Sequence, residues 1–195
     1  LKLAATMPSN DVCLLVSQAT KMVCSGEIRQ TLQRGNFQLR REEYFELVGM
    51  KTAALFALAC ELGACLTNED DQATQRILRE YGKLLGIAFQ IYDDCLDVFG
   101  TEDVAGKSLG TDLATGKATL PMLLALERAS EIERKSWLAM LQAGESQAGA
   151  VRERLIAEGV PASCRMVVAD FVSQAVLVLE DLPGSSEPLA VLSEC

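Results

Sequence analysis

The sequence contains no histidine. This absence excludes Ser-His-Asp and Cys-His catalytic groups, and also zinc sites that use histidine ligands. Positive charge is scarce as well, because 18 basic residues stand against 27 acidic ones and the net charge is −9. Nucleic acids and anionic membranes both need basic surfaces, so neither is expected as a partner. An anionic substrate stays open, because a bound divalent cation would reverse the local charge.

Cysteine pairs of the CxxC type are absent, and the seven cysteines form an odd total. We therefore expect reduced thiols and a cytoplasmic location. The most apolar stretch, Ala53 to Leu66, contains Glu61 and is too short to cross a bilayer, so no transmembrane segment is predicted. The N-terminus lacks a signal-peptide pattern and begins with Leu1, which predicts that the chain starts inside a longer protein.

Aromatic residues make up only 5% of the chain, and no stretch alternates apolar and polar residues in the manner of a strand. Caps and glycines instead mark the ends of helices. The predicted helices cover residues 9–34, 41–66, 69–99, 121–128, a segment after Ser130, 145–158 and 161–180. Ser130 and Glu133 form a capping-box pattern, and residues 101–116 are expected to be a loop. The prediction is a single all-α domain over residues 1–195.

Three aspartates, Asp93, Asp94 and Asp97, stand within five residues at the end of a largely apolar helix. Helical spacing places Asp93 and Asp97 on one face, with Asp94 at its edge and Gln90 one turn earlier. Two carboxylates about 6 Å apart repel by roughly 3 kcal/mol at an effective dielectric near 20. No Lys or Arg stands three or four residues away to compensate, and all-oxygen ligands of this kind are typical of Mg²⁺ sites. The alternative is a solvated acidic helix end.

Two lysines follow in a glycine-rich stretch between Gly106 and Pro121. Lys107 and Lys117 are suited to pair with a metal-bound diphosphate, because lysine places a compact positive charge beside phosphate oxygens. The alternative is that each lysine is an exposed loop residue.

Four sequence blocks together resemble the trans-type polyprenyl diphosphate synthases. The blocks are FQIYDDCLDVFG (89–100), GKSLGTDLATGKATLP (106–121), GEIRQ (26–30) and KTAALF (51–56). The first two are similar to the second aspartate-rich region of that family, and the stretch before residue 56 is most like its medium- and long-chain branch, which makes octaprenyl and solanesyl diphosphates. The resemblance implies an all-α helical bundle of the isoprenoid synthase type. Because no first aspartate-rich motif or isopentenyl diphosphate site is found, the N-terminal helices are expected to be missing.

The resemblance also implies a metal site. Asp93 would ligate Mg²⁺ directly, and Asp94 and Asp97 would complete the cluster directly or through water. Asp112 would hold a metal-bound water.

The same resemblance implies roles toward an allylic substrate. Lys51 and Lys107 would grip its diphosphate, and Lys117 would add positive potential. Thr52 and Gln90 would face the allylic carbon as positive charge develops there.

The activity so implied is a prenyltransferase that condenses isopentenyl diphosphate with an allylic prenyl diphosphate. In this reaction Mg²⁺ assists ionisation of the allylic diphosphate. The family precedent is a homodimer, and we expect this chain to be inactive alone because it carries one of two aspartate clusters. The alternative is a non-catalytic, synthase-like subunit of a heteromeric complex; a terpene cyclase fits less well. An upstream DDxxD in the gene would favour the enzyme, and a start codon close to Leu1 would favour the subunit.

Overall fold

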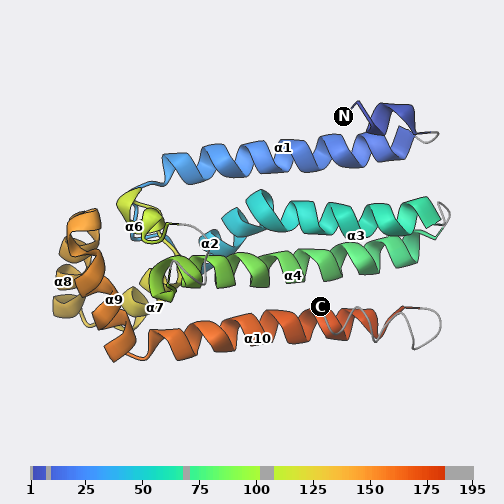
Figure 1. Cartoon of the computed structure of the whole chain (residues 1–195). Helices are drawn as coiled ribbons and strands as arrows, with labels where there is room; N and C mark the ends of the chain where they lie inside the picture. The colour runs from blue at the N-terminus through green and yellow to red at the C-terminus, as the bar shows by residue number, and fades with distance from the viewer. Residues whose placement is uncertain (1, 8–9, 68–70, 102–107, 183–195) are drawn as a thin grey trace. The chain divides into compact units, whose positions relative to one another are not determined.

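A computed structural model describes residues 2–7, 10–67, 71–101 and 108–182, and every regular element in these ranges is helical (Figure 1). The α-helices are α1 (Asn10–Leu32), α2 (Arg41–Val48), α3 (Ala54–Thr67), α4 (Gln72–Phe99), α6 (Thr111–Ala114), α7 (Leu120–Arg128), α8 (Glu131–Gln142), α9 (Ala148–Ala157) and α10 (Val160–Leu179). Short 3₁₀ turns cover Ala4–Thr6 and Gly144–Gln147, and a π-helical turn covers Gly49–Ala53. The all-α prediction is confirmed.

Several predicted boundaries agree with the structure within a few residues. Gly35, which follows α1, has a φ of +79°, a backbone conformation that suits glycine and ends a helix. Ser130 and Glu133 make the predicted capping box at the start of α8. The prediction that residues 101–116 form a loop throughout was wrong, because α6 lies within that range.

The chain divides into two compact units. The first comprises Leu1–Glu27, Val48–Ala88 and Ala169–Cys195, and the second comprises Ile28–Leu47 and Phe89–Val168. The first unit has a core of Tyr81 and Leu84 packed against Ala175 and Leu179. Helix α4 therefore meets α10 through aliphatic and aromatic side chains within this unit.

Helices α3 and α4 lie side by side in the first unit (Figure 1), and two glycines of α4 allow this close packing. A Cβ atom on Gly82 would lie 2.5 Å from the carbonyl oxygen of Phe56. A Cβ atom on Gly86 would lie 2.7 Å from the Cα atom of Ala53. Both distances are shorter than real contacts, so the backbones can approach this closely only without side chains at these positions.

The second unit has its core around α7. All residues from Leu120 to Leu126 are buried, and Trp137 of α8 and Leu155 of α9 are fully buried in the same unit. Pro121 stands in the first turn of α7, as predicted, where its missing N–H costs no helical hydrogen bond. This apolar block supports the segment that precedes α7 and carries Lys117.

Two helical runs, Arg41–Thr67 and Val160–Leu179, are long and apolar enough to cross a membrane by length and composition alone. The first run is longer than the apolar stretch from Ala53 to Leu66, because α2, the π-helical turn and α3 follow one another without a break. Within the first run, Glu61 pairs with Arg79 of α4. Core helices of soluble proteins meet the same criterion, so this feature by itself does not indicate a membrane protein.

We predict that Gly86→Ala lowers the free energy of unfolding by about 1–3 kcal/mol, the usual cost of overpacking a tight contact. Gly63→Ala is the matched control, because Gly63 lies inside α3 and a Cβ atom there would have no neighbouring atom within 4 Å. The control should gain roughly 0.5–1 kcal/mol from the better helix propensity of alanine. Urea unfolding followed by circular dichroism measures both changes, and equal effects would show that α3 and α4 do not meet at Gly86.

Candidate functional site

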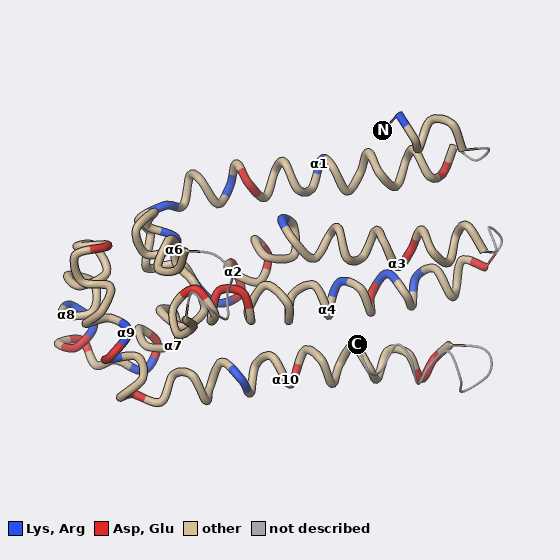
Figure 2. The backbone as a smooth tube through the Cα atoms, in the orientation of Figure 1, with Lys and Arg blue, Asp and Glu red and all other residues tan. Residues whose placement is uncertain are grey.

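Acidic residues gather along the last turns of α4, in the second unit (Figure 2). The structure buries two of the three predicted aspartates: Asp94 is 0% exposed and Asp97 is 5% exposed. Asp93 is only half-buried. The three carboxylates therefore differ in environment, although the sequence spacing alone places them on a common helical face.

Asp94 accepts hydrogen bonds at both of its oxygens. The hydroxyl of Tyr44, from α2, donates to Oδ2 at 2.8 Å. The amide of Gln90 and the ammonium of Lys117 both donate to Oδ1, each at 2.8 Å. A buried carboxylate needs such partners, because its desolvation is otherwise very costly. No Lys or Arg stands three or four residues from the aspartates, and the cation that compensates Asp94 is Lys117, which stands 23 residues later in the chain.

Asp97 holds the beginning of α6. Its Oδ1 accepts from the backbone N–H of Thr111 at 3.3 Å and from the Thr111 hydroxyl at 3.0 Å, and its Oδ2 accepts from the N–H of Asp112 at 3.1 Å. The N–H groups in the first turn of a helix have no partners within that helix, and a carboxylate satisfies them well. This contact explains why a short helix forms where a loop was predicted.

Lys117 bridges two carboxylates, because its Nζ lies 2.8 Å from Asp94 Oδ1 and 2.9 Å from Asp112 Oδ2. Burial by itself would lower the pKa of Lys117, but the charges of Asp94 and Asp112 outweigh it and raise that pKa above 10.5. The pKa of Asp112 is also raised, first by burial and then by the charges of Asp94 and Asp97, against the opposing effect of Lys117.

The cluster holds more negative than positive charge. The residues linked by these contacts include four carboxylates (Asp93, Asp94, Asp97 and Asp112) and one ammonium, that of Lys117, which pairs with Asp94 and Asp112. A divalent cation would relieve the repulsion that contributes to the raised pKa of Asp112. Within the described residues, no group of three or more acidic or cysteine side chains is arranged to hold a metal by itself. Carboxylate oxygens are the ligands of hard divalent cations, which often complete their coordination with water and substrate phosphates.

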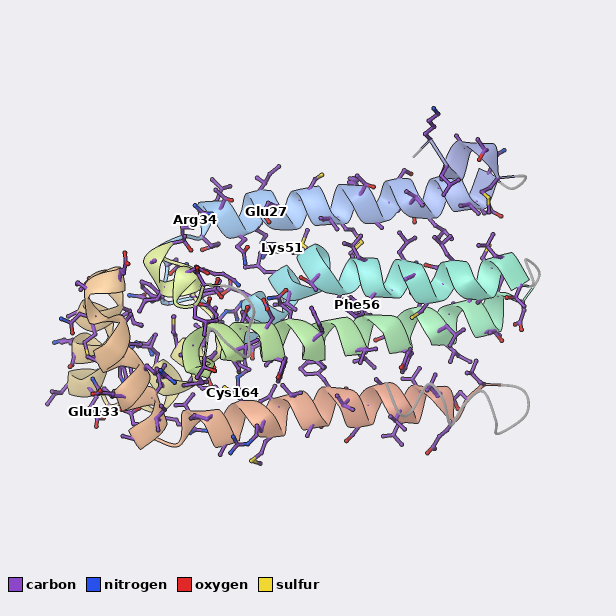
Figure 3. All side chains as sticks on the ribbon, in the orientation of Figure 1. Glu27, Arg34, Lys51, Phe56, Glu133 and Cys164 are labelled. Atoms are coloured by element: carbon purple, nitrogen blue, oxygen red, sulfur yellow. The ribbon has the colours of Figure 1, made fainter. Side chains whose placement is uncertain are left out.

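Lys51 and Thr52 lie in the π-helical turn of the first unit. Such turns are rare inside helices and are frequent at functional sites. Lys51 Nζ is 2.8 Å from Glu27 Oε2 of α1, and the two side chains point toward one another (Figure 3). Gly26 allows this approach, because a Cβ atom there would lie 2.9 Å from Cβ of Met50. Glu27 lies in the GEIRQ block that resembles the family, but its pairing with Lys51 was not predicted from the sequence.

The structure brings together Gln90, Asp93, Asp94, Asp97, Asp112 and Lys117 in the second unit. Lys107 lies outside the described residues, and Lys51 and Thr52 belong to the first unit, so a cavity shared by these residues stays a prediction. Tyr44 and Thr111 were not predicted from the sequence. Their contacts with α4 join residues 50 and 14 positions apart, and nothing in the local pattern around either residue signals them.

Comparison with known proteins gives a consistent picture. A family model described as "Polyprenyl synthetase" matches residues 1–158. The "Short chain isoprenyl diphosphate synthase" of Methanothermobacter thermautotrophicus is 34% identical over 188 residues, which are 96% of this chain and 54% of that protein. The "Heptaprenyl diphosphate synthase component 2" of Bacillus subtilis is 38% identical over 113 residues, which are 58% of this chain and 32% of that protein. The chain thus spans about half the length, or less, of these curated relatives.

A solved structure shows the same fold. A polyprenyl synthase from Caulobacter crescentus, complexed with calcium and isoprenyl diphosphate, matches with a TM-score of 0.86 and 33% identity, over 95% of this chain and 57% of that one. The predicted helical bundle of the isoprenoid synthase type is confirmed.

We predict that Lys117→Met lowers the free energy of unfolding at neutral pH by about 3–5 kcal/mol, because it leaves the buried Asp94 carboxylate without its charge partner. Lys135→Met, at an exposed position on α8, is the control and should change the free energy of unfolding little. Since folding raises the pKa of Lys117, its stabilising contribution is complete below pH 10.5 and is lost as the pH rises through the folded-state value. The difference in the free energy of unfolding between wild type and Lys117→Met should therefore be constant near neutral pH. It should shrink only when urea unfolding is measured at strongly alkaline pH. A difference that shrinks near neutral pH would contradict the assigned pairing.

Proposed function

Since the chain belongs to the polyprenyl synthetase family, we propose that the protein is a trans-prenyltransferase that condenses isopentenyl diphosphate with an allylic prenyl diphosphate. The observation that carries the proposal is the linked cluster of four carboxylates and one ammonium, that of Lys117, which has an excess of negative charge and two buried aspartates. Such a cluster is suited to a divalent cation that carries a diphosphate. The calcium and isoprenyl diphosphate bound to the Caulobacter relative support this choice of ligands.

Mg²⁺ is the metal that we propose for this site. When bound, it would neutralise the negative charge that develops on the departing diphosphate. Asp93 is the best direct ligand, because it is half-buried, whereas Asp94 and Asp97 are buried. Asp94 and Asp97 would act through water or through the groups that they hold. Asp112 would hold a metal-bound water.

The remaining residues have proposed roles toward the allylic substrate. Lys51 and Lys107 would hold its diphosphate, and Lys117 would contribute positive potential at the edge of the cluster. Thr52 and Gln90 would stabilise the carbon from which the diphosphate departs. Gln90 already donates its amide N–H to Asp94, an orientation that turns its amide oxygen away from that carboxylate.

A non-catalytic subunit of a heteromeric complex is the second candidate. It is supported by the Bacillus relative, whose name describes it as component 2 of a heptaprenyl diphosphate synthase. The two candidates differ in assembly and in activity, since an enzyme of the first kind would form an active homodimer. Light scattering on the complete gene product, expressed alone, distinguishes a homodimer from a subunit that needs a partner.

We also propose a cytoplasmic location, which fits the thiol form of the cysteines that the structure describes.

We predict that the complete gene product incorporates radiolabelled isopentenyl diphosphate into longer prenyl chains when an allylic co-substrate and Mg²⁺ are present. Asp93→Ala should lower turnover by about 100-fold or more, because the metal acts on charge that develops in the transition state. Asp170→Ala, at an exposed position on α10, is the matched control and should keep wild-type turnover. The chain of residues 1–195 should show no turnover by itself.

Full activity of Asp93→Ala would remove the metal role of this residue. Absence of product from the wild-type gene product, with every allylic co-substrate from dimethylallyl to geranylgeranyl diphosphate, would favour the non-catalytic subunit.

We predict further that Glu27→Gln strengthens pyrophosphate binding, because Lys51 then loses the carboxylate that pairs with it in the absence of substrate. Exposed ion pairs are worth about 0.2–1 kcal/mol, so the gain in affinity should be at most about fivefold. Glu46→Gln is the control, since Glu46 forms a comparable exposed pair with Arg29. Isothermal titration calorimetry with pyrophosphate and Mg²⁺ measures the change, and equal affinities for the two variants would argue against diphosphate binding by Lys51.

A further inference from the structure

Tyr44 is a buried tyrosine whose hydroxyl points at the acidic cluster. Its side chain is 2% exposed, and its hydroxyl donates to Oδ2 of Asp94 at 2.8 Å. Burial, and then the charge of Asp94, raise the pKa of Tyr44 well above its ordinary value, so the hydroxyl keeps its proton and serves as a donor. A polar contact between two such buried side chains is expensive to leave incomplete.

The contact reaches beyond Asp94. Gln90 and Lys117 both use Oδ1 of Asp94, while Tyr44 uses Oδ2. The direction in which the Asp94 carboxylate turns therefore depends on all three donors. Lys117 in turn contacts Asp112, so the hydrogen-bonded chain runs from Tyr44 on α2 to Asp112 on α6.

We propose that Tyr44 is a positioning residue of the acidic cluster, which fixes the Asp94 carboxylate and, through it, the side chains of Lys117 and Gln90. The importance of Tyr44 for catalysis rests on the proposed function. The effect of Tyr44 on the position of Lys117 is independent of that function. Tyr44 makes no contact with a substrate in this role; it acts through Asp94.

Removal of the hydroxyl has a definite structural consequence. In Tyr44→Phe, Oδ2 of the fully buried Asp94 loses its donor, and the carboxylate gains by turning that oxygen toward Lys117 or Gln90. Lys117 then no longer rests in one position between Asp94 and Asp112. Its ammonium becomes more accessible, and the part of the cluster that it holds becomes less well ordered.

Competitive labelling of the 195-residue chain with acetic anhydride tests this without a ligand. Mass spectrometry gives the acetylation of Lys117 relative to the exposed Lys135. In Tyr44→Phe this ratio should rise by about threefold or more, which corresponds to a loss of ordering within the range for one buried hydrogen bond. Tyr92→Phe makes the same chemical change at a tyrosine that is 58% exposed, and it should leave the ratio unchanged. An unchanged ratio in a folded Tyr44→Phe would overturn the proposal.

A second variant shows whether Tyr44 acts through Asp94. In an Asp94→Leu background, Tyr44→Phe should add little to the labelling of Lys117, because no oxygen remains at position 94 to link the two side chains. If Tyr44→Phe raises the labelling of Lys117 as much in that background as in the wild-type chain, the proposal is overturned. The comparison between the two backgrounds stays valid even where both substitutions lower the unfolding midpoint.

Binding of Mn²⁺ with pyrophosphate, followed by electron paramagnetic resonance, connects the network to the proposed function. Tyr44→Phe should weaken this binding by about threefold or more if the cluster holds the ligand, and Tyr92→Phe should not. Greater labelling of Lys117 with unchanged ligand affinity would support the positioning of Lys117 by Tyr44 and would refute the link between this network and ligand binding. A wild-type chain that binds no Mn²⁺–pyrophosphate, but shows the predicted labelling, would support the role of Tyr44 and refute the proposed function.

Discussion

The second unit depends on one buried charge, the carboxylate of Asp94. A fully buried anion without partners would cost more than a small domain can tolerate, so the surroundings must supply donors and a cation. Tyr44 from α2, Gln90 from α4 and Lys117 from the segment before α7 meet this need. Each of these donors belongs to a different part of the chain. Asp94 therefore fixes the relative positions of three segments within the unit and restricts the orientations that the site can adopt.

Asp97, one turn further along α4, organises the other side of the site. Its carboxylate accepts from the first backbone N–H groups of α6, and α6 presents Asp112 to Lys117. Two aspartates of a motif that resembles a metal site are thus engaged by the protein itself. Asp93 is left as the most accessible carboxylate of the three. The two buried aspartates therefore shape this part of the unit through the groups that they hold.

In the first unit, close backbone packing has a similar organising role. Gly82 and Gly86 let α4 approach α3, and Gly26 lets α1 approach the π-helical turn that carries Lys51. The absence of side chains at these positions brings Lys51 and Glu27 into contact. Glu27 thus partly balances the charge of Lys51, which lessens the cost of placing that charge beside apolar helices.

The sequence by itself determined the all-α fold, because helical caps and apolar spacing are local properties that need no tertiary contact. The capping box at Ser130, the proline in the first turn of α7 and the end of α4 at Phe99 all follow from residues close in the chain. Local pattern also placed the three aspartates on one helix. Tertiary structure alone decided which of them is buried, that Lys117 supplies the cation and that Tyr44 supplies a donor, since these contacts join residues 23 to 50 positions apart. Such pairings depend on how helices pack, and the spacing of residues within one helix does not encode them.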